Sequence, residues 1–381
     1  MSDAEIVTLG SVTSWLSGGT PNRSNEEYWS GSVPWISAST LKDLEIYDSP
    51  QRVTAAAVRA GSKMAPIGAT LILVRGMALH RELRAGIVTR PVCFNQDVKA
   101  LIPAPSVLPR FLLYAIYAQG RQILDLVSSA GSGTGVLDTS LLKRVRIWLP
   151  SPRRQAEVVA ILDDVERHLA TMDRLIAKKQ AVKQGMMQQL LIGKTRLPGF
   201  TRPWLVGPFK YFMPLQRGFD LPTPQVKPGA YPVVYSNGVA RTHAIAMAKG
   251  PGVITGRSGT IGKVHYVSAD YWPHNTALWV TNFAHTNAKF VYYFLSQLGL
   301  ERFASGSGVP TFNRNDAHGF EVRMPSEVRE QEAIAKVLTD VDDEIEALRR
   351  RLAKARAVKQ CMMQELLNGS TRLPGTEAVD Q

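Results

Sequence analysis

The chain has 381 residues, and its 45 lysines and arginines exceed its 32 aspartates and glutamates, which gives a formal net charge of +13. That excess predicts a polyanionic partner, and nucleic acid is favoured over an anionic membrane surface because no long basic amphipathic helix carries an aromatic face. No apolar run approaches the roughly 20 residues needed to cross a bilayer, and residues 1–8 do not resemble a leader peptide, so we expect a cytoplasmic protein.

The first 150 residues are predicted to form a globular unit of mixed α and β structure with long loops. Aliphatic and β-branched runs bounded by Gly and Pro mark short strands, and a longer apolar run marks a helix. The expected elements are strands at 33–37, 69–74, 86–89 and 92–102, a short strand or turn at 7–15, a basic loop at 80–84, a helix at 109–127 and a glycine-rich turn at 131–135.

A long amphipathic helix is predicted within residues 151–199. It follows the proline turn at 149–152 and ends at Gly193, with Pro198 beyond, which matches the usual start and stop signals of helices. Its apolar residues recur in alternating steps of four and three, the pattern of a coiled-coil seam. The seam consists of Val158, Leu162, Val165, Leu169, Met172 and Ile176, after which we expect its phase to shift to Val182, Met186 and Leu190.

Residues 200–325 are predicted to form a second globular unit whose landmarks follow the order of the first. Pro232 corresponds to Pro34, the run 253–257 to 71–75, and Asn275 to Asn95. A helix at 289–297 and a glycine turn at 306–308 correspond to the helix start at 110–118 and the turn at 131–133. The spacing between matched landmarks varies, so the two units share a plan and differ in detail.

Residues 326–375 repeat the helix of 151–199 at a constant offset of 176, and residues 376–381 form a tail. The runs 181–184 and 195–199, for example, recur at 357–360 and 371–375 without a gap, which indicates an internal duplication. The seam of this second helix consists of Ile334, Leu338, Val341, Ile345, Leu348, Leu352 and Ala355, followed in the shifted phase by Val358, Met362 and Leu366.

Each predicted helix is acidic near its start and basic near its end, which favours antiparallel pairing because opposite charges then meet. A solvated charged face is the simpler interpretation of any single charge run, but the seam and the duplication favour pairing. The expected fold class is α+β, with two globular mixed α/β domains separated by two long helices of roughly 55 to 60 Å that form an antiparallel coiled coil, and with pseudo-twofold symmetry.

No catalytic, cofactor or metal constellation is recognisable. The run 193–195 resembles the end of a phosphate loop, but Gln188 stands where that loop needs glycine, so we expect a helix C-cap. The glycines at 131–135 lack the dinucleotide-binding spacing. Cys93, Cys361 and the seven histidines have no metal-ligand spacing, and we expect both thiols to be reduced and packed. The chain is predicted to bind a partner rather than to catalyse a reaction.

Three motifs, taken with the duplication, carry a family resemblance. They are Tyr231-Pro232-Val233-Val234-Tyr235-Ser236-Asn237-Gly238, the run 254–264 (Ile-Thr-Gly-Arg-Ser-Gly-Thr-Ile-Gly-Lys-Val), and Arg329-Glu330-Gln331-Glu332-Ala333-Ile334. The first two are similar to a target-recognition domain, and the third is similar to the start of a helix that the family conserves. The chain resembles the specificity subunit of type I restriction-modification systems over nearly its whole length.

The resemblance implies that residues 1–150 and 200–325 are target-recognition domains 1 and 2, each reading one half of a bipartite double-stranded DNA site. The central conserved helix (151–199) and the C-terminal conserved helix (326–375) would set the distance between them, and half-sites one helical turn apart are separated by about 34 Å. The helices would also dock two methyltransferase subunits, which two restriction/motor subunits join. The chain would bind no cofactor itself: S-adenosylmethionine comes with the methyltransferase partner, and ATP and Mg with the motor/nuclease partner.

Candidate DNA contacts follow from chemistry, because phosphates attract Arg and Lys while base edges are read by Arg, Asn, Gln and hydroxyl groups on loops. Turn capping is the structural alternative for Asn95 and Asn275, and a buried ion pair is the alternative for Arg257. The candidates are Arg75, His80, Arg81, Arg84 and Gln96 in the first unit, and Ser236, Asn237, Arg241, His243, Arg257, Ser258, Lys263 and Asn275 in the second.

Other functions stay open. One is the specificity subunit of a related multi-subunit methyltransferase/nuclease without the type I motor. Another is a fused or cryptic methyltransferase or nuclease, which would bind S-adenosylmethionine or cut DNA alone. The last is a coiled-coil adaptor without a DNA role, which salt-sensitive, specific DNA binding by the assembled complex would exclude.

Overall fold

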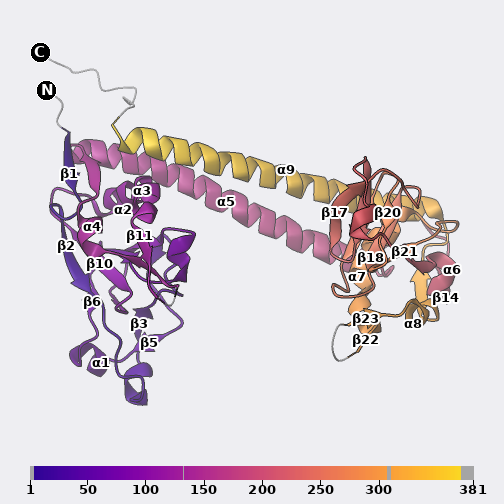
Figure 1. The fold of residues 1–381 in the computed structure, drawn as a ribbon, viewed down its shortest axis with the longest axis horizontal. Helices are drawn as coiled ribbons and strands as arrows, with labels where there is room; N and C mark the ends of the chain where they lie inside the picture. Colours follow the sequence, from indigo (N-terminus) through magenta and orange to yellow (C-terminus); the bar gives the residue numbers. More distant parts are fainter. Residues whose placement is uncertain (1–3, 132, 307–309, 370–381) are drawn as a thin grey trace, which may run out of the picture. The chain divides into compact units, whose positions relative to one another are not determined.

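The computed structural model describes residues 4–131, 133–306 and 310–369, which form two compact units (Figure 1). Unit 1 is Met1–Thr171 with Leu352–Gln381, and unit 2 is Met172–Arg351. The two long helices predicted from the sequence are present as α5 (Pro152–Leu190) and α9 (Val328–Leu367), and each contributes one part to each unit. The run 371–375, the tail 376–381 and most of the expected turn at 306–308 lie outside the described residues.

Unit 1 contains two main sheets and two strand pairs. The five-stranded sheet has the order β2 (Thr13–Ser17), β10 (Val98–Pro103), β7 (Thr70–Leu73), β8 (Ala85–Val88) and β4 (Glu45–Ile46). The four-stranded sheet has the order β5 (Arg52–Val53), β3 (Val33–Ile36), β9 (Val92–Phe94) and β6 (Met64–Ala65). The pairs are β1 (Glu5–Thr8) with β13 (Arg146–Leu149), and β11 (Val127–Ser129) with β12 (Gly135–Leu137).

The shorter helices of unit 1 connect these strands. They are η1 (Glu26–Trp29), α1 (Ala55–Arg59), η2 (Met77–His80), α2 (Pro109–Ala118), α3 (Gly120–Asp125) and α4 (Thr139–Lys143). The expected single helix at 109–127 is wrong, because Gln119 leaves the helical conformation before Gly120, a poor helix former, and Val127 begins a strand. The expected strand at 92–102 is also two strands, β9 and β10, which belong to different sheets.

Unit 2 repeats the plan of unit 1. Its four-stranded sheet has the order β15 (Leu215–Arg217), β21 (Ala277–Val280), β18 (Gly252–Gly256) and β19 (Val264–Val267). A three-stranded sheet has the order β17 (Gly238–His243), β16 (Tyr231–Tyr235) and β20 (Trp272–Pro273). The other strands form two pairs, β14 (Leu205–Pro208) with β24 (Glu321–Met324) and β22 (Ala304–Ser305) with β23 (Thr311–Phe312). The shorter helices are α6 (Phe209–Phe212), η3 (Thr223–Gln225), α7 (Ala288–Leu298), η4 (Leu300–Phe303) and α8 (Arg314–His318).

The strand pairing of the two units corresponds. The antiparallel order β2-β10-β7-β8 matches β15-β21-β18-β19, and the parallel pair β3 and β9 matches β16 and β20. The predicted mixed α/β units with a common plan are therefore confirmed.

Each unit has its own hydrophobic core, to which both long helices contribute. In unit 1 the apolar face of α2 packs with β7 and β10 against Val158 and Leu162 of α5 and Met363 and Leu366 of α9. In unit 2 the corresponding core joins α7 to Met187 and Leu190 of α5 and to Ile334 and Leu338 of α9. The start of one long helix and the end of the other are thus built into the same core in each unit.

A fully buried glutamine at equivalent positions attaches each long helix to its unit. Gln155 donates from Nε2 to the carbonyls of Ser106 and Pro150 at 2.9 Å each, and its Oε1 accepts the Leu108 N–H at 2.8 Å. Gln331 makes the same set of contacts, donating to the carbonyls of His285 (3.2 Å) and Pro325 (3.0 Å) and accepting the Asn287 N–H at 2.8 Å. An unmade hydrogen bond is costly in the interior, so these amides fix where each helix begins.

The two long helices pair antiparallel in both units, as predicted. In unit 2, Lys183 forms an ion pair with Asp342 at 2.6 Å, and Lys179 pairs with Glu344. In unit 1, Lys359 pairs with Glu166. At the offset of 176, Lys359 is the counterpart of Lys183, and Asp342 is the counterpart of Glu166. The same lysine–carboxylate ion pair of the repeat is therefore formed once in each unit.

The expected shift in the phase of the seam is wrong. Val182 and Val358 are 51% and 47% exposed, whereas the unshifted positions Lys179, Lys183 and Lys359 are partly buried. A lysine can lie in the seam because its aliphatic stem packs along the partner helix while its ammonium group reaches an acidic residue at the edge. The 3.5-residue repeat therefore continues through residues that a search for apolar side chains misses.

Both long helices end at a glycine whose backbone is left-handed. Gly193 has φ +71°, and the Lys194 N–H donates to the Gln189 carbonyl at 3.0 Å, which confirms the predicted C-cap. Gly369 has φ +72°. A Cβ atom would lie 3.0 Å from the Trp204 ring at Gly193 and 2.8 Å from Trp148 Nε1 at Gly369, so an indole covers each helix end closely.

The two cysteines lie in different environments. Cys93 is buried, as expected, but Cys361 is exposed on α9, so the expectation of two packed thiols is wrong for that residue. Burial raises the pKa of the Cys93 thiol.

Within the described parts of the chain, no helix combines the length and the apolar character that a membrane span requires.

Candidate nucleic-acid interface

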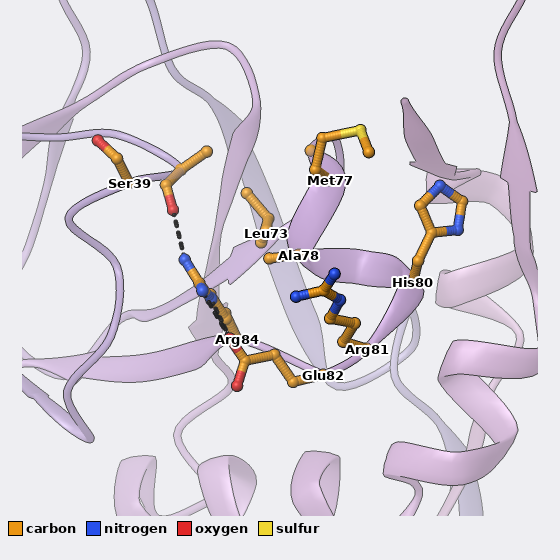
Figure 2. Close-up of a pocket in the computed structure, with 10 residues that line it drawn as sticks. Ser39, Leu73, Met77, Ala78, His80, Arg81, Glu82 and Arg84 are labelled. Carbon is orange, nitrogen blue, oxygen red and sulfur yellow. Dashed lines mark hydrogen bonds and ion pairs between the residues drawn. The ribbon is translucent and has the colours of Figure 1, made fainter. Parts of the chain in front are cut away.

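Three candidate residues of unit 1 line one pocket of ≈ 560 Å³ (Figure 2). The pocket lies between the end of β7 and the turn of η2, and His80, Arg81 and Arg84 surround it together with Glu82, Met77 and Ser39. Met77 is 65% exposed, so apolar and cationic groups are both accessible here. Such a surface can contact both the phosphate backbone and base edges of DNA.

The two arginines of this pocket differ in their freedom. Arg84 donates from Nε and Nη2 to Glu82 Oε1 at 2.8 and 2.6 Å, and from Nη1 to the Ala38 carbonyl at 3.0 Å. The Arg81 guanidinium makes no hydrogen bond or ion pair with the described residues, and Figure 2 shows it beside Arg84 without a contact. Arg84 therefore shapes the turn, whereas Arg81 is available to a ligand.

The other candidates of unit 1 lie near the same strand ends. His80 Nε2 is 2.9 Å from the Gly133 carbonyl, which ties η2 to the turn between β11 and β12. Arg75 is exposed two residues after the end of β7. Gln96 is exposed between β9 and β10, and its Oε1 accepts a hydrogen bond from the Thr20 hydroxyl at 2.5 Å.

In unit 2, four candidate residues meet around Thr276. The Thr276 carbonyl accepts the backbone N–H groups of Arg257 and Ser258 at 2.8 and 3.2 Å, and its hydroxyl accepts the Ser236 N–H at 3.4 Å. Arg257 Nε donates to the carbonyl of the neighbouring Asn275 at 2.9 Å, so the alternative of a buried ion pair for Arg257 is wrong. Loops distant in the sequence are thereby joined into one surface.

The remaining candidates of unit 2 lie outside this cluster. Asn237 is exposed at the turn between β16 and β17, and Lys263 is exposed just before β19. Arg241 is exposed on β17 and donates to the Thr223 hydroxyl at 3.3 Å. His243 is buried, with Nδ1 3.0 Å from the Lys227 N–H and its ring against Trp272, so we leave it out of the proposed DNA contacts.

The candidate surfaces of both units rest on the same backbone arrangement, which we call the shared frame. In unit 1 the N–H groups of Val74 and Arg75 donate to the Asp97 carbonyl at 2.8 and 3.2 Å, as Arg257 and Ser258 do to Thr276. The Asn95 N–H donates to the Ile36 carbonyl at 2.9 Å, and the His274 N–H donates to the Val234 carbonyl at 2.9 Å. The shared frame thus consists of residues 74–75 and 95–97 in unit 1 and of 257–258 and 274–276 in unit 2.

The shared frame corrects the matching of the two units by one residue. Arg75 corresponds to Ser258 rather than to Arg257, and Asn95 corresponds to His274 rather than to Asn275. Consequently Gln96 corresponds to Asn275 and Asp97 to Thr276. Asn95 is buried, and its Nδ2 group donates to Asp97 Oδ2 at 2.9 Å. It therefore stabilises the turn between β9 and β10, as the alternative of turn capping proposed.

His274, Thr276 and Asp220 were missed by the sequence analysis. His274 lies 4.1 Å from the Tyr235 ring, centroid to centroid, and Asp220 accepts a hydrogen bond from Asn275 Nδ2. Burial holds the pKa of His274 below its usual range, with Arg241 lowering it further and Asp220 opposing the shift. A usable signal existed for two of them, because His-Asn-Thr at 274–276 is a polar run between buried strands.

No group of histidine, cysteine, aspartate or glutamate side chains that could hold a metal ion is found among the residues that the structure describes.

Comparison with known proteins gives one consistent result. A family model described as "Type I restriction modification DNA specificity domain" matches residues 1–179 and 222–356. The specificity subunit of the type I restriction enzyme EcoR124I/EcoR124II from Escherichia coli is 31% identical over 163 residues, which are 42% of this chain and 40% of that protein. The chain therefore matches less than half the length of this relative.

Two further relatives match over most of the chain. The specificity subunit of the type I restriction enzyme EcoprrI, also from Escherichia coli, is 21% identical over 360 residues, covering 89% of this chain and 88% of that protein. The crystal structure of the S subunit of a type I restriction-modification system from M. genitalium superimposes with a TM-score of 0.61 over 96% of both chains at 14% identity, which indicates a common fold.

Proposed function

Because this chain belongs to the type I restriction modification DNA specificity family, we propose that it gives a type I restriction-modification complex its DNA sequence specificity. Each of its two units reads one half of a bipartite duplex site. The target-recognition domains are residues 1–150 and 200–325, and the helical segments 151–199 and 326–375 join them.

The observation that carries this proposal is one backbone plan with different side chains. The two units share their strand order, their glutamine attachment and the shared frame, yet the frame positions hold Val74, Arg75 and Gln96 in one unit and Arg257, Ser258 and Asn275 in the other. A duplicated scaffold with divergent polar groups at one surface is suited to reading two different sequences, because base edges are distinguished by donor and acceptor patterns.

The proposed contacts combine cations and base-reading groups. Arg75, Arg81 and Lys263 are exposed and suited to phosphates, while Gln96, Ser236, Asn237 and Asn275 are suited to base edges. His80, Arg84, Arg241, Arg257 and Ser258 lie on or beside the same surfaces and support them. The net charge of +13 favours such binding and predicts that it weakens as salt is added.

The chain does not catalyse in this proposal. Two methyltransferase subunits dock on the long helices and bring S-adenosylmethionine, and two restriction/motor subunits bring ATP and Mg. The exposed outer positions of α5 and α9, such as Val182 and Val358, offer apolar area to such partners.

Methylation mapping tests this function. The chain is co-expressed with the methyltransferase subunit from its own operon in a host without other methyltransferases, and modified bases are located across the genome. We expect methylation within one two-part sequence with a constant gap, and none when either protein is expressed alone. Methylation of one continuous sequence, or modification that does not need this chain, would contradict the proposal.

A further inference from the structure

We infer that Gln96 and Asn275 are the same base-reading position of the two units and have opposite hydrogen-bond polarity in their contacts with Thr20 and Asp220. Gln96 presents a donor, and Asn275 presents an acceptor. This inference rests on the proposed function and adds to it the chemical class of base that each residue reads.

The equivalence of the two positions follows from the shared frame and from two glycines beside it. A Cβ atom on Gly18 would lie 2.1 Å from the Asn95 carbonyl oxygen, and one on Gly218 would lie 2.2 Å from the His274 carbonyl oxygen. Only glycine permits this approach of two backbones. The loop that follows β2 or β15 therefore passes the frame at the same place in each unit.

The second residue after each glycine lies next to the amide in question. In unit 1 the Thr20 hydroxyl donates to Gln96 Oε1 at 2.5 Å, and in unit 2 Asn275 Nδ2 donates to Asp220 Oδ1. The partners are 76 and 55 residues apart in the chain, so neither pair is a local turn contact. The turn capping considered for Asn275 is thus replaced by a contact between two loops.

Asp220 determines which end of the Asn275 amide is free. An ionised carboxylate only accepts hydrogen bonds, and Arg217 Nη2 lies 3.5 Å from the same oxygen of Asp220. The Asn275 amide must therefore direct Nδ2 toward Asp220, which leaves Oδ1 without a partner among the described residues. Oδ1 can accept from the amino group of adenine or cytosine in the major groove.

In unit 1 the amide has the opposite orientation, with Gln96 Oε1 directed toward the Thr20 hydroxyl. Because that hydroxyl donates to Gln96 Oε1, the Nε2 group of Gln96 is directed away and free to donate. The matching base edges are acceptors, namely guanine O6 and N7, adenine N7 or thymine O4. Thr20 and Asp220 are positioning residues, since they act on DNA only through the neighbouring amide.

The test uses the complex of the full chain with its methyltransferase, after its two-part site has been mapped. Asp220→Asn lets the Asn275 amide turn over, and Thr20→Val frees that of Gln96 at nearly constant volume. Binding to duplexes changed one base pair at a time then gives the preference at every position. We expect each variant to lose about tenfold discrimination at one position of one half-site.

Each variant serves as the control for the other half-site. The change of charge in Asp220→Asn is controlled by Asp316→Asn, which removes an exposed carboxylate elsewhere in unit 2. Asn275→Ala and Gln96→Ala remove the reading groups themselves and should lose preference at the same two positions. If the complex still methylates its bipartite site while all four variants keep every base preference, the inference is overturned and the proposed function stands. A uniform loss for all sequences would also overturn it, because it marks a phosphate contact.

Discussion

At the residue scale, chemically identical side chains of one loop have different roles. Arg81 and Arg84 are separated by two residues, and both were candidates for DNA contact. Three donor contacts hold Arg84 to Glu82 and Ala38, whereas the Arg81 guanidinium has none with the described residues. The number of donors already used distinguishes a residue that shapes a site from one that can bind a ligand.

This difference predicts opposite effects of two alanine substitutions. Arg81→Ala should weaken DNA binding by the complex to a similar degree for all sequences and reduce the salt slope by about 1, without lowering the midpoint of thermal unfolding. Arg84→Ala should lower that midpoint, because the Ala38 carbonyl loses its donor and Glu82 its partner. Fluorescence anisotropy and scanning calorimetry measure the two effects, with exposed Arg90→Ala as the control. Equal effects of Arg81→Ala and Arg90→Ala on binding would contradict the assignment.

At the element scale, the long helices combine an apolar seam with lysines placed within it. The Lys359 and Glu166 side chains are only 21% and 18% exposed, so their ion pair is screened less than one at the surface. The equivalent pair of Lys183 with Asp342 occurs at the other end of α5. Because both pairs need opposite ends of the two helices to meet, they favour antiparallel alignment over parallel.

Charge reversal tests this alignment. Lys359→Glu should destabilise unit 1 by about 2 kcal/mol, above the value of an exposed pair and below the 3 to 5 kcal/mol of a fully buried one. Adding Glu166→Lys should restore most of the loss, since the pair is then remade with its charges exchanged. Thermal unfolding of the full chain gives both values, with the exposed Lys354→Glu as the matched control on α9. A double variant no more stable than Lys359→Glu would refute the pairing.

At the scale of the whole molecule, the duplication puts the start of one long helix and the end of the other into each core. Each long helix therefore contributes residues to the cores of both units. The pseudo-twofold symmetry expected from the sequence stays a prediction, as does the proposed role of the helices in setting the gap of the DNA site.

Shortening both helices tests that role. Removing residues 170–176 and 349–355 deletes one heptad from each helix, which keeps the seam in phase and shortens the pair by about 10 Å. We expect the complex to prefer a gap shorter by about three base pairs, at 3.4 Å per base pair. Methylation mapping measures the gap, and removal of the tail 376–381 is not expected to alter it. An unchanged gap in a folded, active complex would refute the role.

Sequence alone determined the features that depend on residues close together in the chain. The long helices, the first part of each seam and the C-cap at Gly193 were predicted correctly, because helix periodicity and capping are local, and the charge gradients along the helices gave their antiparallel pairing. The same reasoning failed where local signals were ambiguous. The helix break at Gln119 is one example. The lysines of the seam are another, because acidic partners on the other helix hold them there.

Only the tertiary structure decided which candidates share a surface. Three results depend on contacts between segments that are distant in the sequence. They are the burial of His243, the freedom of Arg81 but not of Arg84, and the correspondence of Gln96, rather than Asn95, to Asn275. Thr20 meets Gln96 across 76 residues of sequence, and no periodicity encodes such a contact. The sequence thus specified the scaffold, and the fold specified the site, because hydrogen-bond donors and acceptors take their roles from neighbours that the packing of the strands supplies.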